Sequence, residues 1–222
     1  MKVSILGAGN VGKALAQKFI NQNIPVSFGV RNPDDPKYDN LKVIHGNLVS
    51  FQTINDLDKD HDFIFIAVPW VSVTEALRGL TYKKGQIICD CTNPLTSDLK
   101  GLHHSDGLSG GEKVASLLPD AHVMKAFNHT GAGNIEKPRY EDGTTLMFVA
   151  GDNLMAKQKT LSIISRLGFQ GVDIGDLTEA KHLENLALFW IHMAYNTNVG
   201  PNHSLALLKE NSPQMQTQPY DH

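Results

Sequence analysis

Short apolar runs alternate along this chain with longer stretches in which apolar residues recur every three or four positions. Continuous apolar runs are typical of parallel strands buried on both faces, and the longer spacing is typical of amphipathic helices. The pattern predicts strands at residues 2–6, 25–30, 43–44, 62–69, 86–91, 122–127, 145–150 and 172–174. It predicts helices at residues 13–19, 50–58, 70–80, 112–118, 154–167 and 178–195, and irregular segments at 92–110 and 128–140.

This alternation of strand and helix predicts an α/β fold with a doubly wound, mainly parallel sheet. We expect residues 1–175 to form the dinucleotide-binding domain and residues 176–222 to form a long helix and a tail packed on the same domain. Ligands of such sheets bind beyond the carboxyl ends of the strands. That rule directs attention to the loops at residues 7–12, 31–37, 68–72, 91–94 and 126–133.

Three glycines follow the first strand directly, in the spacing Gly7-x-Gly9-x-x-Gly12, and a helical pattern comes next. We expect Gly7 to allow a tight turn off the strand and Gly9 to let the backbone approach a diphosphate. Gly12 would let the helix pack close to the strand, while the free N–H groups at the helix start face the anion. The arrangement predicts dinucleotide binding; the alternative is a glycine-rich turn without a ligand.

The end of the second strand predicts which dinucleotide is bound. An NAD enzyme usually has Asp or Glu there, whereas this chain has Arg31, followed by Asn32. A guanidinium can bind a 2′-phosphate in bidentate fashion and stack on the adenine, so the sequence predicts NADP over NAD. Lys37 would add positive charge to the same pocket. The alternative is that Arg31 and Lys37 are solvated loop residues.

Composition excludes several other classes of protein. The formal net charge of the 222 residues is −3, without the basic stripe of a nucleic-acid binder. No run of about 18 apolar residues occurs, so we expect no membrane partner. Met1 leads directly into the first strand, and a cytoplasmic location is the expectation. Cys89 and Cys91 are two apart in an apolar run, which favours buried thiols over a disulfide or a metal site.

The remaining loops contain few candidates for proton transfer. His129 is the one plausible acid in the expected place, although a lone loop histidine more often makes only structural hydrogen bonds. Lys125 lies inside an apolar strand, where reaching the strand end or pairing with an acid is favoured over catalysis. Trp70 could stack on a flat ligand or pack on the next helix. The side chain of Asn93, freed by the following proline, could bind the cofactor or the substrate.

Taken together, these motifs resemble the NADP oxidoreductase family that includes the coenzyme F420-dependent enzymes, and also the cytosolic domains of certain membrane metalloreductases. The resemblance covers most of residues 1–210. The motifs are VSILGAGNVG at 3–12, GVRNP at 29–33, IAVP at 66–69, DCTNPL at 90–95, KAFN at 125–128 and LENLA at 183–187.

The resemblance implies a Rossmann-type fold, NADP at the glycine loop, hydride exchange with coenzyme F420 or a flavin, and a homodimer. It implies that Gly9, Asn10 and Val11 meet the pyrophosphate and that Arg31 meets the 2′-phosphate. It places three further residues at the nicotinamide end: Val68 and Pro69 along the ribose, and Ala126 beside the ring. The chain departs from the family at Val30, where a serine can help to bind the phosphate.

Three functions fit this sequence. The leading hypothesis is an NADPH-dependent oxidoreductase that passes hydride to a flat, flavin-like small molecule. The second is a carbonyl or imine reductase of the hydroxyacid dehydrogenase or pyrroline-carboxylate reductase type. The third is a dinucleotide-binding module that senses redox state without catalysis.

Overall fold

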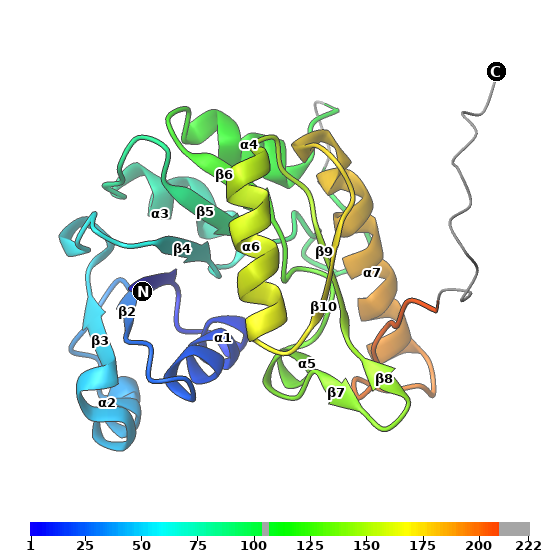
Figure 1. The fold of residues 1–222 in the computed structure, drawn as a ribbon, viewed down its shortest axis with the longest axis horizontal. Coiled ribbons are helices and arrows are strands. Elements are labelled where there is room, and N and C mark those ends of the chain that lie inside the picture. Colours follow the sequence, from blue (N-terminus) through cyan, green and yellow to red (C-terminus); the bar gives the residue numbers. More distant parts are fainter. Residues whose placement is uncertain (104–106, 209–222) are drawn as a thin grey trace.

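A parallel sheet of six strands forms the centre of the computed structural model, which describes residues 1–103 and 107–208 (Figure 1). The strand order is β3-β2-β1-β4-β5-β6. The strands are β1 (Val3–Leu6), β2 (Val26–Gly29), β3 (Val49–Gln52), β4 (Phe63–Ile66), β5 (Ile87–Asp90) and β6 (His122–Lys125). The chain crosses over from β3 to the far side of β1, so the sheet is doubly wound and the predicted Rossmann-type fold class is confirmed.

Helices cover both faces of this sheet. They are α1 (Asn10–Ile20), α2 (Asp39–His45), α3 (Val73–Arg78), α4 (Gly110–Leu117), α5 (Ala132–Glu136), α6 (Leu154–Arg166) and α7 (Ala180–Asn196). Short 3₁₀ turns are η1 (Pro36–Tyr38), η2 (Gly46–Leu48), η3 (Ile54–Asp56), η4 (Trp70–Ser72) and η5 (Leu177–Glu179). The core has two parts, one shared by the sheet with α1 and α6, the other by the sheet with α3 and α4.

Strand β4 shows why the strands read as unbroken apolar runs. Phe63 and Phe65 join the core on one face, whereas Ile64 and Ile66 join the core on the other. Successive side chains of a strand point to opposite faces, so a strand buried on both faces must be apolar at every position.

Two predictions near the N-terminal edge are wrong. Val43 and Ile44, predicted as a strand, lie in α2, where their side chains are 82% and 63% exposed. Residues 50–58, predicted as a helix, hold most of β3 and the turn η3. The third strand is β3, which pairs with β2 in parallel and places Phe51 opposite Phe28. Pairing with a neighbour that is distant in sequence outweighed local β-propensity here.

The region after β6 also differs from the prediction. Residues 128–140, predicted as a loop, contain the short helix α5, which packs on α1. Two small strands follow, β7 (Arg139–Tyr140) and β8 (Gly143–Thr144), which pair antiparallel. The predicted strands at 145–150 and 172–174 are β9 (Leu146–Val149) and β10 (Gln170–Asp173); they form a separate parallel pair that reaches β6 through a bridge between Lys125 and Ala150.

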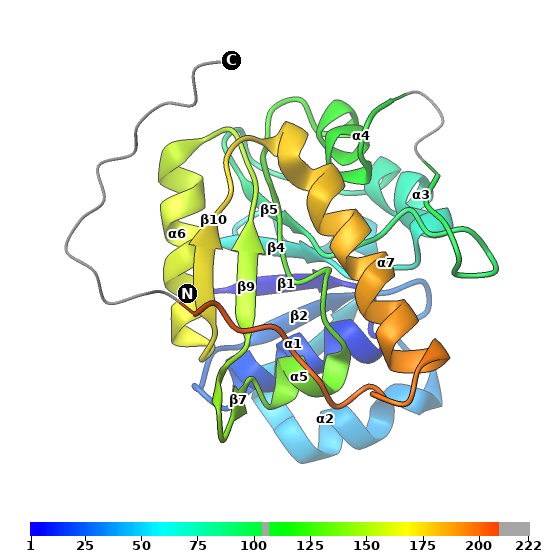
Figure 2. The same cartoon turned by 90° about the vertical axis from the view of Figure 1, so that its right-hand side faces the viewer.

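The long helix α7 packs against α4. In Figure 2 it runs diagonally across the side of the molecule that faces the viewer, beside β9. The segment after α7 turns back, and Leu205 accepts a backbone hydrogen bond of 2.8 Å from Leu146. The division of the chain at residue 175 stays a prediction, and residues 209–222 of the predicted tail lie outside the described residues.

Two further features of the fold concern its cysteines and its helices. Cys89 and Cys91 are buried free thiols, as the sequence predicted. Among the described residues, no helix combines the length and the apolar character that crossing a membrane requires.

Candidate dinucleotide site

An open cavity of about 670 Å³ lies at the carboxyl ends of β1, β2 and β4. Its volume is in the usual range for a small-molecule site. Seven of the predicted cofactor-binding residues line it: Gly7, Gly9, Arg31, Asn32, Lys37, Val68 and Pro69. The cavity therefore joins the glycine loop to the ends of the second and fourth strands, as the sequence predicted.

The glycines differ in what they allow. Gly7 has a φ of +97°, and a Cβ there would lie 2.7 Å from the carbonyl oxygen of Ala67. A Cβ on Gly12 would lie 2.1 Å from the carbonyl oxygen of Gly7, so only glycine lets α1 start this close to the loop. Gly9 faces open space, with no atom within 4 Å of its would-be Cβ.

The start of α1 is built to receive an anion. Gly9 is the N-cap residue and makes no side-chain cap, and the first turn holds no acidic residue. The N–H groups of the first turn have no partner within a helix, and the helix dipole places partial positive charge there. Asn10 is exposed and Val11 is half-buried in this turn, whereas Gly12 is buried; none of the three lines the cavity. A diphosphate at Gly9 would meet their backbone rather than their side chains.

Arg31 and Asn32 follow β2 at the rim of the cavity, and both are exposed. In the described part of the chain, the Arg31 guanidinium has no hydrogen bond and no ion pair with another residue. Asn32 is turned inward on its own loop, where its Oδ1 accepts a hydrogen bond of 3.2 Å from the Asp34 amide. Arg31 is therefore available for a phosphate, while Asn32 shapes the loop that presents it.

Lys37 is less available than the sequence suggested. Its Nζ lies 2.6 Å from Oδ2 of Asp35 and 4.9 Å from the centre of the Tyr38 ring. The hydrogen bond that Lys37 donates to Asp35 raises the pKa of Lys37, and the same bond lowers the pKa of Asp35. Lys37 stays charged at the cavity, but Asp35 neutralises much of that charge.

Sequence reasoning missed residues that line the cavity from η1, from the turn after the edge strand β3, and from η4 and α3. These are Tyr38, Thr53, Ile54, Asn55, Ser72, Glu75 and Ala76. Thr53, Ile54 and Asn55 were missed because the third strand was placed six residues too early. A usable sequence signal was the aromatic residue at position 51: in the structure the ring of Phe51 stacks on that of Phe28 on the neighbouring strand, with ring centres 4.9 Å apart, as aromatic residues on paired strands often do.

The predicted residues Asn93 and Ala126 lie outside this cavity. Ala126 has no exposed surface. Asn93 Nδ2 donates 2.8 Å to the Asn128 carbonyl oxygen, and Asn128 Nδ2 donates 2.8 Å to Asn93 Oδ1. Asn128 Nδ2 also donates to the Leu183 carbonyl oxygen at 3.0 Å, which ties the ends of β5 and β6 to α7. Asn128 Oδ1 is buried with no partner.

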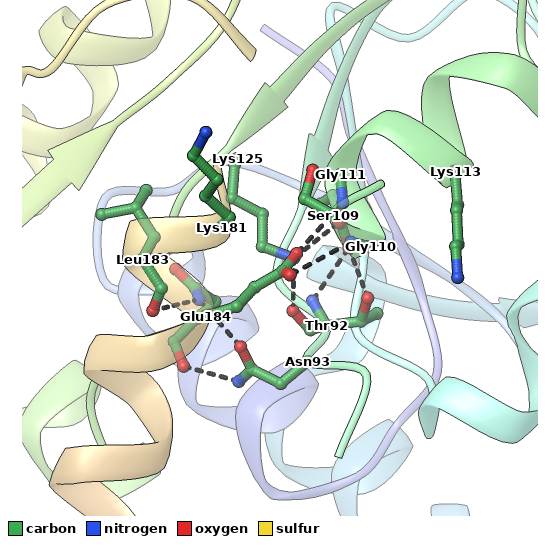
Figure 3. Close-up of polar contacts among 12 residues, drawn as sticks. Thr92, Asn93, Ser109, Gly110, Gly111, Lys113, Lys125, Lys181, Leu183 and Glu184 are labelled. Carbon is green, nitrogen blue, oxygen red and sulfur yellow. Dashed lines mark hydrogen bonds and ion pairs between the residues drawn. The ribbon is translucent and has the colours of Figure 1, made fainter. Parts of the chain in front are cut away.

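A buried ionic cluster lies next to this asparagine pair (Figure 3). Lys125 has no exposed surface, and its Nζ is 2.8 Å from Asp90 Oδ2 and 2.8 Å from Glu184 Oε1. It also donates 2.6 Å to the Thr92 carbonyl oxygen. Burial alone would lower the pKa of Lys125, but the two carboxylates outweigh burial and raise it. Lys125 thus pairs with acids, as the sequence favoured.

Glu184 links this cluster to the start of α4. Figure 3 shows it reaching from α7 toward Lys125 and the first turn of α4. The amides of Gly110 and Gly111 each donate 3.1 Å to its carboxylate. A Cβ on Gly110 would lie 2.9 Å from Glu184 Oε1, so the glycine permits this approach. Ser109 and Glu112 form a capping box on the same turn.

His129 is placed as a hydrogen-bond acceptor. It is 2% exposed, and its Nε2 accepts a hydrogen bond of 3.1 Å from the Phe148 amide. Burial lowers the pKa of His129 to about 4. The imidazole is neutral at pH 7, and it uses the acceptor nitrogen within the core. Its candidacy as a proton donor is therefore not supported.

The side chain of Trp70 packs against the core and does not project into the cavity. It is half-buried against the core beneath α3 and α4. A Cβ on Gly110 would lie 3.2 Å from its ring, so the indole contacts the start of α4. It does not line the cavity.

A doubly wound sheet, a glycine loop at its first strand–helix junction and a free arginine after the second strand define a Rossmann dinucleotide-binding protein. Comparison with known proteins narrows this class. Residues 2–94 match the model of the family "NADP oxidoreductase coenzyme F420-dependent". The match covers less than half of the chain and confirms the resemblance that the sequence motifs indicate.

A metalloreductase is among the proteins to which the chain is similar. The chain is 29% identical to Metalloreductase STEAP3 of Rattus norvegicus over 188 residues, which are 84% of this chain and 36% of the relative. The chain thus spans little more than a third of the length of that relative.

Solved structures show the same fold. A proposed F420-dependent NADP reductase of Arthrobacter sp. FB24 is 25% identical with a TM-score of 0.83, covering 94% of this chain and all of that one. A reductive aminase of Aspergillus terreus in complex with NADPH has a TM-score of 0.63 at 16% identity, covering 88% of this chain and 62% of that one. The second likeness shows the fold alone.

Proposed function

We propose that this protein transfers hydride between NADP(H) and a flat acceptor of the flavin or deazaflavin type. The main observation behind the proposal is that neither candidate proton donor near the nicotinamide end is free to act. His129 is neutral and accepts a hydrogen bond, and Lys125 is held by two carboxylates. Hydride transfer between two rings requires that they face one another closely, but it does not require an acid.

Arg31 supports NADP as the cofactor. A guanidinium without a partner at the cavity rim matches a phosphate on the adenosine ribose, and a charge-assisted contact of this kind is worth roughly 1.5–3 kcal/mol. The diphosphate would bind at Gly9 and the first turn of α1. Val68 and Pro69 would cover the next ribose.

The choice of acceptor rests on the comparisons. The matched family is named for coenzyme F420, and the Arthrobacter structure is named an NADP reductase dependent on F420. Relatives named metalloreductases favour ferric chelates, reduced through a flavin, as a second acceptor class.

The test follows NADPH oxidation with coenzyme F420, FMN, ferric chelates, quinones and small imines in turn. We expect turnover with F420 or FMN, and ferric reduction only when a flavin is present. With NADPH deuterated at C4, the label should appear in the reduced deazaflavin, because direct transfer moves the hydride itself. Turnover with imines alone would overturn the proposal, and binding of NADP without any turnover would favour a redox sensor.

A variant separates ring-to-ring transfer from acid catalysis. His129→Gln keeps an acceptor for the Phe148 amide and should leave turnover within about twofold, whereas removal of a general acid costs about 10²–10⁴ in rate. A loss of that size would identify His129 as a proton donor and favour a carbonyl or imine substrate.

A further inference from the structure

A second cavity, of about 440 Å³, is lined by residues from the end of α1, the end of α6 and the segment between α5 and β7. These elements can be followed in Figure 1. No residue of this cavity lines the dinucleotide cavity. The glycine loop begins α1 and this cavity lies at its other end; an 11-residue helix is about 16 Å long. The two cavities are therefore separate sites.

Four cationic side chains line this second cavity: Lys18, Lys137, Arg139 and Arg166. No aspartate or glutamate lines it, and none of the four makes an ion pair within the described residues. Burial, and after it the nearby charge of Arg139, lowers the pKa of Lys18. Lys18 and Arg139 thus lie close enough to repel one another, and no carboxylate in the cavity lining offsets their charge.

Helix dipoles explain only part of this charge. Lys18 is in the last turn of α1 and Arg166 is in the last turn of α6, where cations are favoured. Each helix end contributes about half a negative charge. Two such ends offset about one of four positive charges, so about three remain for a ligand.

Arg166 is oriented before any ligand binds. Its Nε donates 2.6 Å to Gln22 Oε1, and Gln22 Nε2 donates 3.0 Å to the Arg166 carbonyl oxygen. This two-way contact uses one edge of the guanidinium and leaves its terminal nitrogens without a partner in the described part of the chain. A planar guanidinium held in this way can bind a phosphate in bidentate fashion.

We propose that this cavity binds a small phosphorylated anion with two to three negative charges, at a site distinct from that of the dinucleotide. The cavity is large enough for a compact metabolite, and the roughly three positive charges left for a ligand match a small anion rather than an extended polyanion.

Calorimetry with inorganic pyrophosphate tests the proposal, on the full chain saturated with NADP and with no magnesium present. NADP then occupies the glycine loop, so pyrophosphate cannot bind there. We expect one site, and citrate in place of pyrophosphate distinguishes phosphate recognition from general anion binding. Absence of heat, equal affinity for citrate, or heat that disappears as NADP is raised would each overturn the proposal.

Variants assign the binding to the four cations. Arg139→Gln and Arg166→Gln should each weaken pyrophosphate about tenfold, the size of one charge-assisted contact. Lys137→Gln offers an exposed position if Arg166→Gln disturbs folding. Lys159→Gln, at an exposed position on the same helix as Arg166, is the matched control and should bind like the parent. Unchanged affinity in Arg139→Gln and Lys137→Gln, or an equal loss in the control, would overturn the assignment.

Discussion

Two cationic residues at the carboxyl end of the sheet, Lys125 and Arg31, differ in how their charge is balanced. Lys125 is wholly buried, and two carboxylates and a carbonyl oxygen of the same chain surround it. Arg31 is exposed at the rim of a cavity and has no partner in the described residues. Both are cations at the carboxyl end of the same sheet, but one is neutralised within the chain and the other only by a ligand.

The difference is a guide to function. A buried ion must be paired because its desolvation is expensive, so the Lys125 cluster fixes the positions of α4 and α7 relative to the carboxyl ends of β5 and β6. An exposed cation without a partner costs the fold little and remains free for binding. A charged side chain that is paired within the protein therefore indicates a structural role, and a charged side chain left unpaired at a cavity indicates a binding site.

The largest expected effect comes from breaking the buried cluster. Lys125→Met leaves Asp90 and Glu184 facing each other without their cation, and removal of one partner from a buried pair costs about 3–5 kcal/mol. Urea unfolding would measure this loss. Lys159→Met, at an exposed position, should change stability by less than about 0.5 kcal/mol. A loss below about 1 kcal/mol for Lys125→Met would show that the cluster is not a structural requirement.

The next effect is a pH dependence caused by His129. Its pKa of about 4 in the folded protein lies below the ordinary value of 6.5, so between these values the unfolded chain binds more protons. Stability should therefore fall as the pH falls from 6.5 toward 4, by about 1.4 kcal/mol per unit and about 3 kcal/mol over the window. Urea unfolding at pH 7 and pH 5 measures it. His129→Gln should lose less stability than the parent; equal slopes would assign the effect to other groups.

Arg31 should affect the ligand and not the fold. Arg31→Asp should weaken NADP binding by about ten- to a hundredfold, because the carboxylate repels the 2′-phosphate, and should barely change NAD binding. Calorimetry with both nucleotides measures this, and the urea midpoint should not move. An equal loss for NADP and NAD would contradict the role given to Arg31.

The smallest effect concerns Val30, which lines the same cavity beside Arg31. Val30→Ser adds a hydroxyl donor for the 2′-phosphate and should tighten NADP binding by about three- to tenfold, the worth of one hydrogen bond. Affinity for NAD serves as the internal control, since it offers no 2′-phosphate. Unchanged NADP affinity would place the phosphate away from the end of β2.

Much of this arrangement could be predicted because its causes are local. Gly7, Gly9 and Gly12 follow a strand in one fixed spacing, and Arg31 follows the next buried strand. The apolar runs of β1, β4 and β5 predict strands buried on both faces. The predictions for β3 and α5 were wrong. β3 depends on pairing with β2, and α5 depends on packing against α1; a short segment of sequence does not reveal either contact.

The amino-acid sequence by itself determined the doubly wound sheet, the glycine loop and the cation after the second strand, because each follows from residues close together in the chain. The tertiary structure alone decided which charges are free. Lys125 contacts Glu184, 59 positions further along the chain, and Lys18 lies near Arg139 only because α1, α5 and α6 end at one place. Partners so far apart in sequence are brought together by the packing of whole elements, and no local pattern encodes that contact.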